Sequence, residues 1–183
     1  MFRKVEHWLL KKPQGLQSRL RIFFFKLLGM QIGNKNRLES GKVRKVYQIE
    51  IGNNNAFSHG YMLWPEDTDS EVSRIKIGDN NYFNRNLMLD ACGSIEIGNN
   101  NMIGPDVYIT DSNHQFGFEI SPSQMPMSVG KVIIGNHCWI GAKAVILKDV
   151  ELGDYCVVAA GAVVTKKFPS GSVIGGIPAN LIK

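Results

Sequence analysis

The sequence lacks several features that would assign a protein at once to a structural class or a cellular compartment. Its longest early apolar run, residues 22–25, ends at Lys26 and is too short to span a bilayer or to form a secretory signal. Only three cysteines occur, an odd number that argues against a disulfide framework. Cys138 and Cys156 are interpreted as small core residues in a reducing compartment, not as a disulfide or a metal pair. We therefore expect a cytoplasmic protein.

Charge and composition exclude few classes of function. The formal net charge of +5 is modest, and over most of the length acidic residues are interspersed with basic ones. That balance suits an anionic small ligand as well as a nucleic acid. A chain of 183 residues is long enough for one domain, and an apolar fraction of 44% is ordinary for a soluble protein. The function must be sought in repeats and motifs.

What the sequence does contain is a period of six residues in its C-terminal part. A branched aliphatic anchor recurs at every sixth position, and a small side chain follows four positions after an anchor. This period fits neither an α-helix nor an alternating strand, but it fits a parallel β-helix, in which three short faces close one triangular coil. The anchors are Ile134, Ile140, Ile146, Leu152, Val158 and Val164, and the small residues are Cys138, Ala144, Val150, Cys156 and Ala162.

The same repeat begins earlier, so the β-helix is expected over residues 32–183. Ile-Gly pairs start at positions 32, 51, 77 and 97, and intervals of 18 to 20 residues correspond to one coil. Asn55, Asn81 and Asn101 fall at matching places in successive coils. Asparagine bonds readily to nearby backbone groups, so these three are expected to form a hydrogen-bonded ladder along the stack.

Residues 1–31 differ from the rest and are expected to form a basic, amphipathic helical segment. Pro13 and Gly15 should divide it into two helices, the second with apolar residues at helical spacing. One interpretation is a cap over the open end of the β-helix. The other, compatible with the first, is peripheral contact of residues 1–30 with an anionic membrane surface. The apolar positions are 16, 20, 23, 24, 27 and 28.

Two gaps interrupt the rhythm and predict loop insertions near residues 60–74 and 111–131. Insertions in a solenoid leave the stack on one side and often carry the binding surface. His114, at the start of the second insertion, is the preferred candidate for a general base, and Asp111 or Glu119 could orient its ring. His59, at the mouth of the first insertion, is a weaker candidate.

These motifs together resemble one known family. The repeats, the Asp-Ser-Asn-His stretch at 111–114, the stretch 134–142 and the ending Gly-Gly-Ile-Pro-Ala at 175–179 are similar to the hexapeptide-repeat O-acetyltransferases. The resemblance covers roughly residues 32–183. It implies a left-handed β-helix, acetyl-CoA as co-substrate, no metal, no nucleic-acid partner and a homotrimer with the active site between subunits.

The resemblance also implies roles for particular residues. His114 matches the family's catalytic histidine, and Asn84, in the stretch 83–86, matches an asparagine that contacts the acceptor sugar. Backbone N–H groups near Gly141 or Ala142 are expected to stabilise an oxyanion. Asn180 departs from the family, which often has Lys or Arg there. The residues implied to bind coenzyme A are Trp139, Gly141, Ala142, Ala160, Gly161, Lys166, Lys167 and Pro178.

The expected function is transfer of an acetyl group to a sugar hydroxyl, in surface polysaccharide or glycan synthesis. An N-acetyltransferase acting on an amino-sugar nucleotide and a catalytically inactive β-helical scaffold stay open as alternatives. A γ-class carbonic anhydrase would need two histidines five residues apart on one coil, and the sequence has no such pair.

Overall fold

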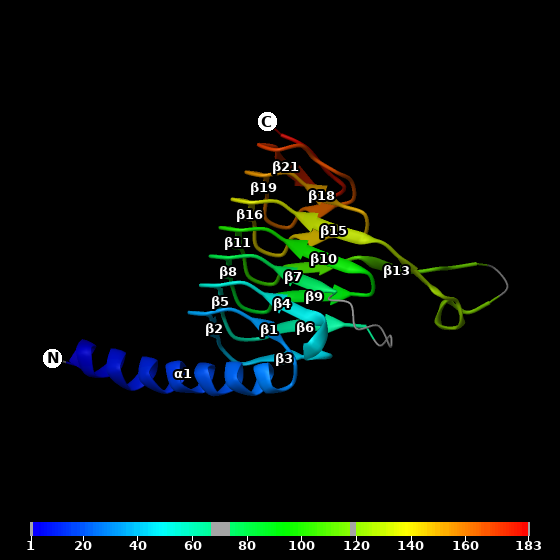
Figure 1. The fold of residues 1–183 in the computed structure, drawn as a ribbon. Helices are drawn as coiled ribbons and strands as arrows, with labels where there is room; N and C mark the ends of the chain where they lie inside the picture. The colour runs from blue at the N-terminus through cyan, green and yellow to red at the C-terminus, as the bar shows by residue number, and fades with distance from the viewer. Residues whose placement is uncertain (1, 67–73, 118–119, 183) are drawn as a thin grey trace.

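In the computed structural model, residues 2–66, 74–117 and 120–182 are described, with side chains from Gly15 onward. One helix, α1 (Phe2–Leu27), is followed by coils that stack into a triangular prism, with the C-terminus at the far end (Figure 1). The short helices η1 (Val46–Gln48) and η2 (Pro122–Gln124) lie outside the sheets. The prism has three sheets, one on each face.

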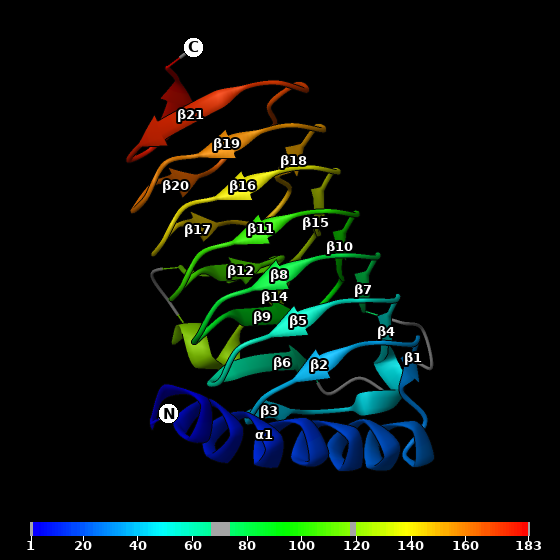
Figure 2. The same cartoon turned by 90° about the vertical axis from the view of Figure 1, so that its left-hand side faces the viewer.

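Within each sheet, neighbouring strands are parallel, except that β22 runs antiparallel to β21. The first sheet contains β1 (Gln31–Ile32), β4 (Ile49–Ile51), β7 (Ile75–Ile77), β10 (Ser94–Ile97), β15 (Lys131–Ile134) and β18 (Glu151–Leu152). The second contains β2 (Arg37–Leu38), β5 (Ala56–Phe57), β8 (Tyr82–Phe83), β11 (Met102–Ile103), β16 (Trp139–Ile140), β19 (Val157–Val158), β21 (Val173–Gly176) and β22 (Ala179–Leu181), and Figure 2 shows it face on. The third contains β3 (Gly41–Val43), β6 (Tyr61–Pro65), β9 (Met88–Ala91), β12 (Tyr108–Thr110), β17 (Val145–Ile146) and β20 (Val163–Val164).

The strand register confirms the predicted repeat. Each anchor pairs with the anchor one coil away, as in Ile134 with Leu152 and Ile140 with Val158. The anchors are buried, and so are Cys138 and Cys156, whose thiols are free. Because every third of a coil contributes one inward apolar side chain, the core is a continuous column along the prism.

The asparagine ladder is also confirmed. The Asn81 N–H donates to Asn55 Oδ1, and the Asn101 N–H donates to Asn81 Oδ1, both at 2.8 Å. The side-chain amides of Asn55 and Asn81 each donate to a glycine carbonyl of the next coil at 2.9 Å. Cys138 continues the row, because its N–H donates to Asn101 Oδ1 at 2.7 Å. The ladder therefore pairs backbone groups at a corner where strand pairing stops.

Replacing Asn81 by alanine should destabilise the protein by about 2–5 kcal/mol, because a buried N–H and a buried carbonyl would both lose their partners. Urea unfolding followed by circular dichroism measures this change. The matched control is Asn34→Ala, since Asn34 lies at an exposed corner and should change stability by less than about 0.5 kcal/mol. Equal effects of the two substitutions would contradict a stabilising ladder.

The N-terminal segment forms one continuous helix, so the predicted division at Pro13 and Gly15 is wrong. Strong helix formers flank these residues and outweigh their local penalty. The cap interpretation is confirmed: the Leu38 N–H donates to Ser18 Oγ at 2.8 Å, and Arg21 Nη1 donates to the Leu38 carbonyl at 2.6 Å. Two further residues of the helix, Ile22 and Phe25, pack against the core.

Both insertions differ in detail from the expected loops. Residues 61–65 remain in the third sheet as β6, and residues 67–73 of the predicted insertion lie outside the described residues. In the second, β13 (Ser112–His114) and β14 (Met127–Val129) pair antiparallel. They form the base of an arm, residues 112–117 and 120–129, that projects from the prism (Figure 1).

Candidate active site

A groove of about 580 Å³ runs along the second sheet and crosses four consecutive coils. Its walls are largely apolar, with Trp139 at the rim and alanines toward the C-terminal end. Five of the residues predicted for the site line it, so the fold brings together positions that lie up to 76 residues apart. The lining residues are Tyr82, Asn84, Met102, Ile103, Gly104, Pro105, Trp139, Gly141, Ala142, Val157, Val158, Ala159 and Ala160.

Glycine at two positions of the groove is required by the stacking of coils. A Cβ on Gly141 would lie 2.5 Å from the Ala160 nitrogen, and a Cβ on Gly104 would lie 2.7 Å from the Ala142 nitrogen. The Gly141 N–H is already used, because it donates to the Val158 carbonyl at 2.8 Å. Of the two predicted oxyanion donors, Ala142 is therefore the better placed.

Asn84 lies at the N-terminal end of the groove, half-buried after β8. Its Oδ1 accepts the Arg85 N–H at 2.8 Å, which fixes the side-chain amide. The Nδ2 group of such an amide is a donor suited to a hydroxyl or carbonyl oxygen. A polar group at the end of an apolar groove can position an acceptor beside an apolar donor arm.

At the other end, the predicted phosphate-binding lysines diverge. Lys166 Nζ donates to Asn180 Oδ1 at 2.9 Å, which joins it to the C-terminal tail. Lys167 Nζ donates to Glu151 Oε2 at 3.0 Å, on the first sheet. Both are exposed, but only Lys166 is held beside β22, which belongs to the same sheet as the groove.

The other two predicted coenzyme A residues do not line the groove. Gly161 has a φ of +70°, and a Cβ there would meet no atom within 4 Å, so the backbone conformation accounts for glycine. Pro178 is exposed in the turn between β21 and β22. Their proposed contacts with coenzyme A stay predictions.

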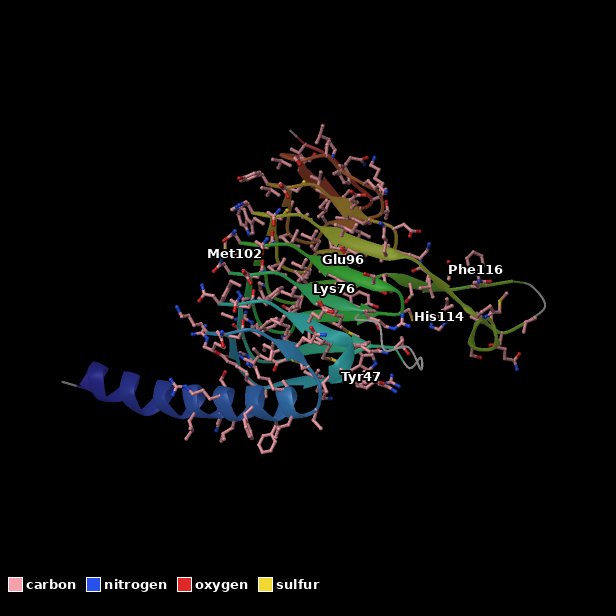
Figure 3. All side chains as sticks on the ribbon, viewed as in Figure 1. Tyr47, Lys76, Glu96, Met102, His114 and Phe116 are labelled. Carbon is pink, nitrogen blue, oxygen red and sulfur yellow. The ribbon has the colours of Figure 1, made fainter. Side chains whose placement is uncertain are left out.

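His114 is exposed on the arm, where it lies opposite Met127 in the antiparallel pair. Figure 3 shows it on one side of the molecule, whereas Met102, which marks the groove, lies on the opposite side. A single chain therefore does not bring His114 to Asn84 or to the groove.

The two carboxylates predicted to orient His114 have different outcomes. Asp111 is buried, and its carboxylate accepts the N–H groups of Cys92 and Gly93 at 2.8 and 2.9 Å. Burial raises the pKa of the Asp111 carboxyl, while these two donors lower it. Asp111 thus holds the turn of a coil that is two residues longer than the 18-residue repeat, and these contacts do not support the orienting role. Glu119 lies outside the described residues.

His59 has a partner that sequence spacing did not reveal. Its Nδ1 lies 3.8 Å from Glu39 Oε2, and both residues line a cleft of about 240 Å³ beside α1. Its carbonyl accepts the Asn86 N–H at 3.0 Å, which places His59 one coil from Asn84. This pair is the alternative base available within one chain. Within the described residues, no group of three His, Cys, Asp or Glu side chains could hold a metal ion.

Sequence reasoning did not single out several groove residues. Tyr82, Met102 and Val157 face outward beside Trp139 on successive strands. Each directly precedes an inward anchor, so the six-residue period carried a signal for them: the position before a second-sheet anchor faces the groove.

Comparison with known proteins supports this fold and family. Residues 131–166 match the family model of the bacterial transferase hexapeptide (six repeats). The galactoside O-acetyltransferase of Escherichia coli is 36% identical over 100 residues, which are 55% of this chain and 49% of that protein. The chain spans about half the length of the curated relatives that it matches.

Two solved structures show the same architecture. An N-acyltransferase from Bacillus cereus, in complex with dTDP and coenzyme A, superposes with a TM-score of 0.74 at 22% identity, covering 86% of each chain. A maltose O-acetyltransferase from Clostridium difficile gives a TM-score of 0.59 at 26% identity, covering 89% of this chain and 73% of that one. The chain is thus a left-handed parallel β-helix, and its resemblance to the hexapeptide-repeat acetyltransferases is confirmed.

Proposed function

We propose that this protein is an acetyl-CoA-dependent O-acetyltransferase that acts on a sugar hydroxyl in surface polysaccharide or glycan synthesis. The observation that carries the proposal is the apolar groove with Asn84 at one end and small residues along its length. Four coils at the usual spacing of β-strands give the groove a length of roughly 14 Å. A narrow apolar channel of that length suits the linear pantetheine arm, and Lys166 would face the phosphates beyond it.

The same site requires a second subunit. The arm exposes Phe116 and Val129, with 89% and 51% of their surfaces accessible, and the groove rim exposes Met102 and Trp139, at 51% and 53%. These apolar surfaces lie on opposite sides of one chain, so a head-to-tail ring would cover both. In a homotrimer of this kind, the arm of one subunit brings His114 to the groove of its neighbour.

The reaction then follows from these positions. His114 from the neighbouring subunit removes the proton from the acceptor hydroxyl, and the hydroxyl oxygen attacks the thioester carbonyl of acetyl-CoA. Asn84 positions the acceptor, and the Ala142 N–H donates to the oxyanion of the tetrahedral intermediate. Collapse of the intermediate breaks the carbon–sulfur bond, leaves the acetyl ester on the sugar, and returns the proton from His114 to the departing thiolate.

Calorimetric titration with acetyl-CoA and with CoA tests the donor first. We expect saturable binding at one site per chain, followed by thiol release when sugar acceptors are added. The product then decides the acceptor chemistry, because an ester is cleaved by hydroxylamine and an amide is not. An amide product would instead place the protein with N-acetyltransferases of amino-sugar nucleotides. No binding at millimolar ligand by a folded protein would favour an inactive scaffold.

Ala160→Tyr should block the groove without disturbing the core. Ala160 is exposed at the C-terminal end of the groove, so the phenol ring would occupy the channel. The Kd for CoA is expected to rise at least about tenfold, with an unchanged melting temperature. The matched control is Lys143→Tyr, at an exposed position of the same corner that does not line the groove. Unchanged affinity in Ala160→Tyr would contradict this path for the donor.

A further inference from the structure

The exposed surface of α1 is apolar, although the helix already serves as a cap. Ser18, Arg21, Ile22 and Phe25 form the face that meets the first coil. The apolar residues that gave the helix its periodicity lie elsewhere, and each has half or more of its surface exposed. They are Leu16 (62%), Leu20 (51%), Phe23 (56%), Phe24 (58%), Leu27 (67%) and Leu28 (63%).

The contacts of the capping face fix which way the apolar face points. Because the Leu38 N–H and carbonyl bind Ser18 and Arg21, α1 cannot roll to bury the apolar residues without breaking both hydrogen bonds. The helix lies across the end of the stack, and side chains project from its surface turned away from the coils (Figures 2 and 3). A flat apolar surface is thus presented at one end of the molecule.

The distribution of charge indicates what covers this surface. Residues 1–30 contain seven Lys or Arg and one acidic residue, whereas residues 31–183 contain 14 Lys or Arg and 15 acidic residues. The whole net positive charge therefore resides in the segment that carries the apolar face. Arg19 and Lys26 are exposed on the helix itself. A helix with an apolar face and flanking cations is typical of segments that lie in the interface of an anionic bilayer.

We propose that the face formed by Leu16, Leu20, Phe23, Phe24, Leu27 and Leu28, the apolar face of α1, docks on an anionic lipid surface. The helix would lie in the plane of the interface and the prism would stand on the membrane. Among the described residues no helix is long and apolar enough to cross a bilayer, and the proposed contact is peripheral. Such contact would present the cleft beside α1 and the groove above it to acceptors held at the membrane.

Flotation with vesicles tests the docking. The full chain is expected to float with vesicles of phosphatidylcholine and phosphatidylglycerol, and to float less as salt is raised, since salt screens the cations. Vesicles of phosphatidylcholine alone should bind it weakly. Phe23→Ser combined with Phe24→Ser should lower the bound fraction at least about tenfold. The matched control is Tyr155→Ser, at an exposed aromatic residue that belongs neither to α1, nor to the arm, nor to the groove lining, and this variant should float as the unaltered chain does.

Circular dichroism and light scattering accompany the flotation. A double variant that keeps its fold and its oligomeric state while losing vesicle binding supports the proposal. Failure of the unaltered chain to float, equal binding to both lipid compositions, or full binding by the folded double variant would overturn it. Dissociation of the double variant into smaller species, together with no vesicle binding by the unaltered chain, would show instead that a second copy covers the face. CoA binding is expected to be the same in all these variants, so the test is independent of the proposed activity.

Discussion

His114→Ala is expected to lower kcat by about 10²–10⁴-fold, the range that general-base assistance supplies. Coenzyme A affinity should be unchanged, because His114 is not among the residues that line the groove and its proposed partner is the acceptor hydroxyl. Thiol release measures the rate, and calorimetry measures the affinity. A proportional loss of both quantities would contradict the assignment of His114 as the base.

The control for this experiment is a substitution of His59, the alternative candidate for the base. His59→Ala removes the partner of Glu39, 3.8 Å away in the small cleft beside α1. We expect this variant to keep most of its turnover. If His59→Ala were the variant that lost turnover, with His114→Ala active, the base would be the pair within one chain and no neighbouring subunit would be needed.

Two inactive variants should restore each other when they share one trimer. His114→Ala retains an intact groove, and Ala160→Tyr retains an intact arm. In a ring of three subunits that contains both kinds of chain, one interface joins an intact groove to an intact arm, whichever kind is in excess. Doubly tagged mixed trimers should therefore show about one third of the turnover of the unaltered protein.

This complementation separates the possible arrangements of the site. Mixed dimers would restore about one half of the turnover. A site built within one chain would restore none, because every chain in the mixture carries a defect. Trimers of either variant alone are the matched controls, and with acetyl-CoA kept well below the raised Kd of Ala160→Tyr both should show little turnover. Activity in either control would mean that the corresponding substitution had not disabled its half of the site.

The core and the corners could be predicted because they depend on local spacing. An anchor such as Ile140 occupies the interior wherever its coil falls, and the coil above repeats the requirement at Val158. Asn81 joins the ladder for the same reason, since one coil places it between Asn55 and Asn101. The groove is built from matching positions of successive coils, but the sequence analysis named only five of its lining residues, from Asn84 to Ala160, and the family resemblance implied these.

The contacts that could not be predicted are those that the period does not govern. Asp111 is close to His114 in sequence, but its carboxylate binds the N–H groups at the turn of Cys92 and Gly93. Lys166 and Lys167 are neighbours in sequence, yet their ammonium groups bind partners on different sheets. Where the chain departs from the repeat, there is no strand register from which the direction of a side chain can be inferred.

The sequence alone determined the coil, its core and the small residues of the groove, because a six-residue period imposes the same environment on every repeat. Only the tertiary structure decided which face of α1 meets the coils and on which side His114 lies. Those outcomes depend on how a helix and an arm pack against the finished prism. Single contacts such as that between Ser18 and Leu38 settle that packing, and no repeat in the sequence encodes them.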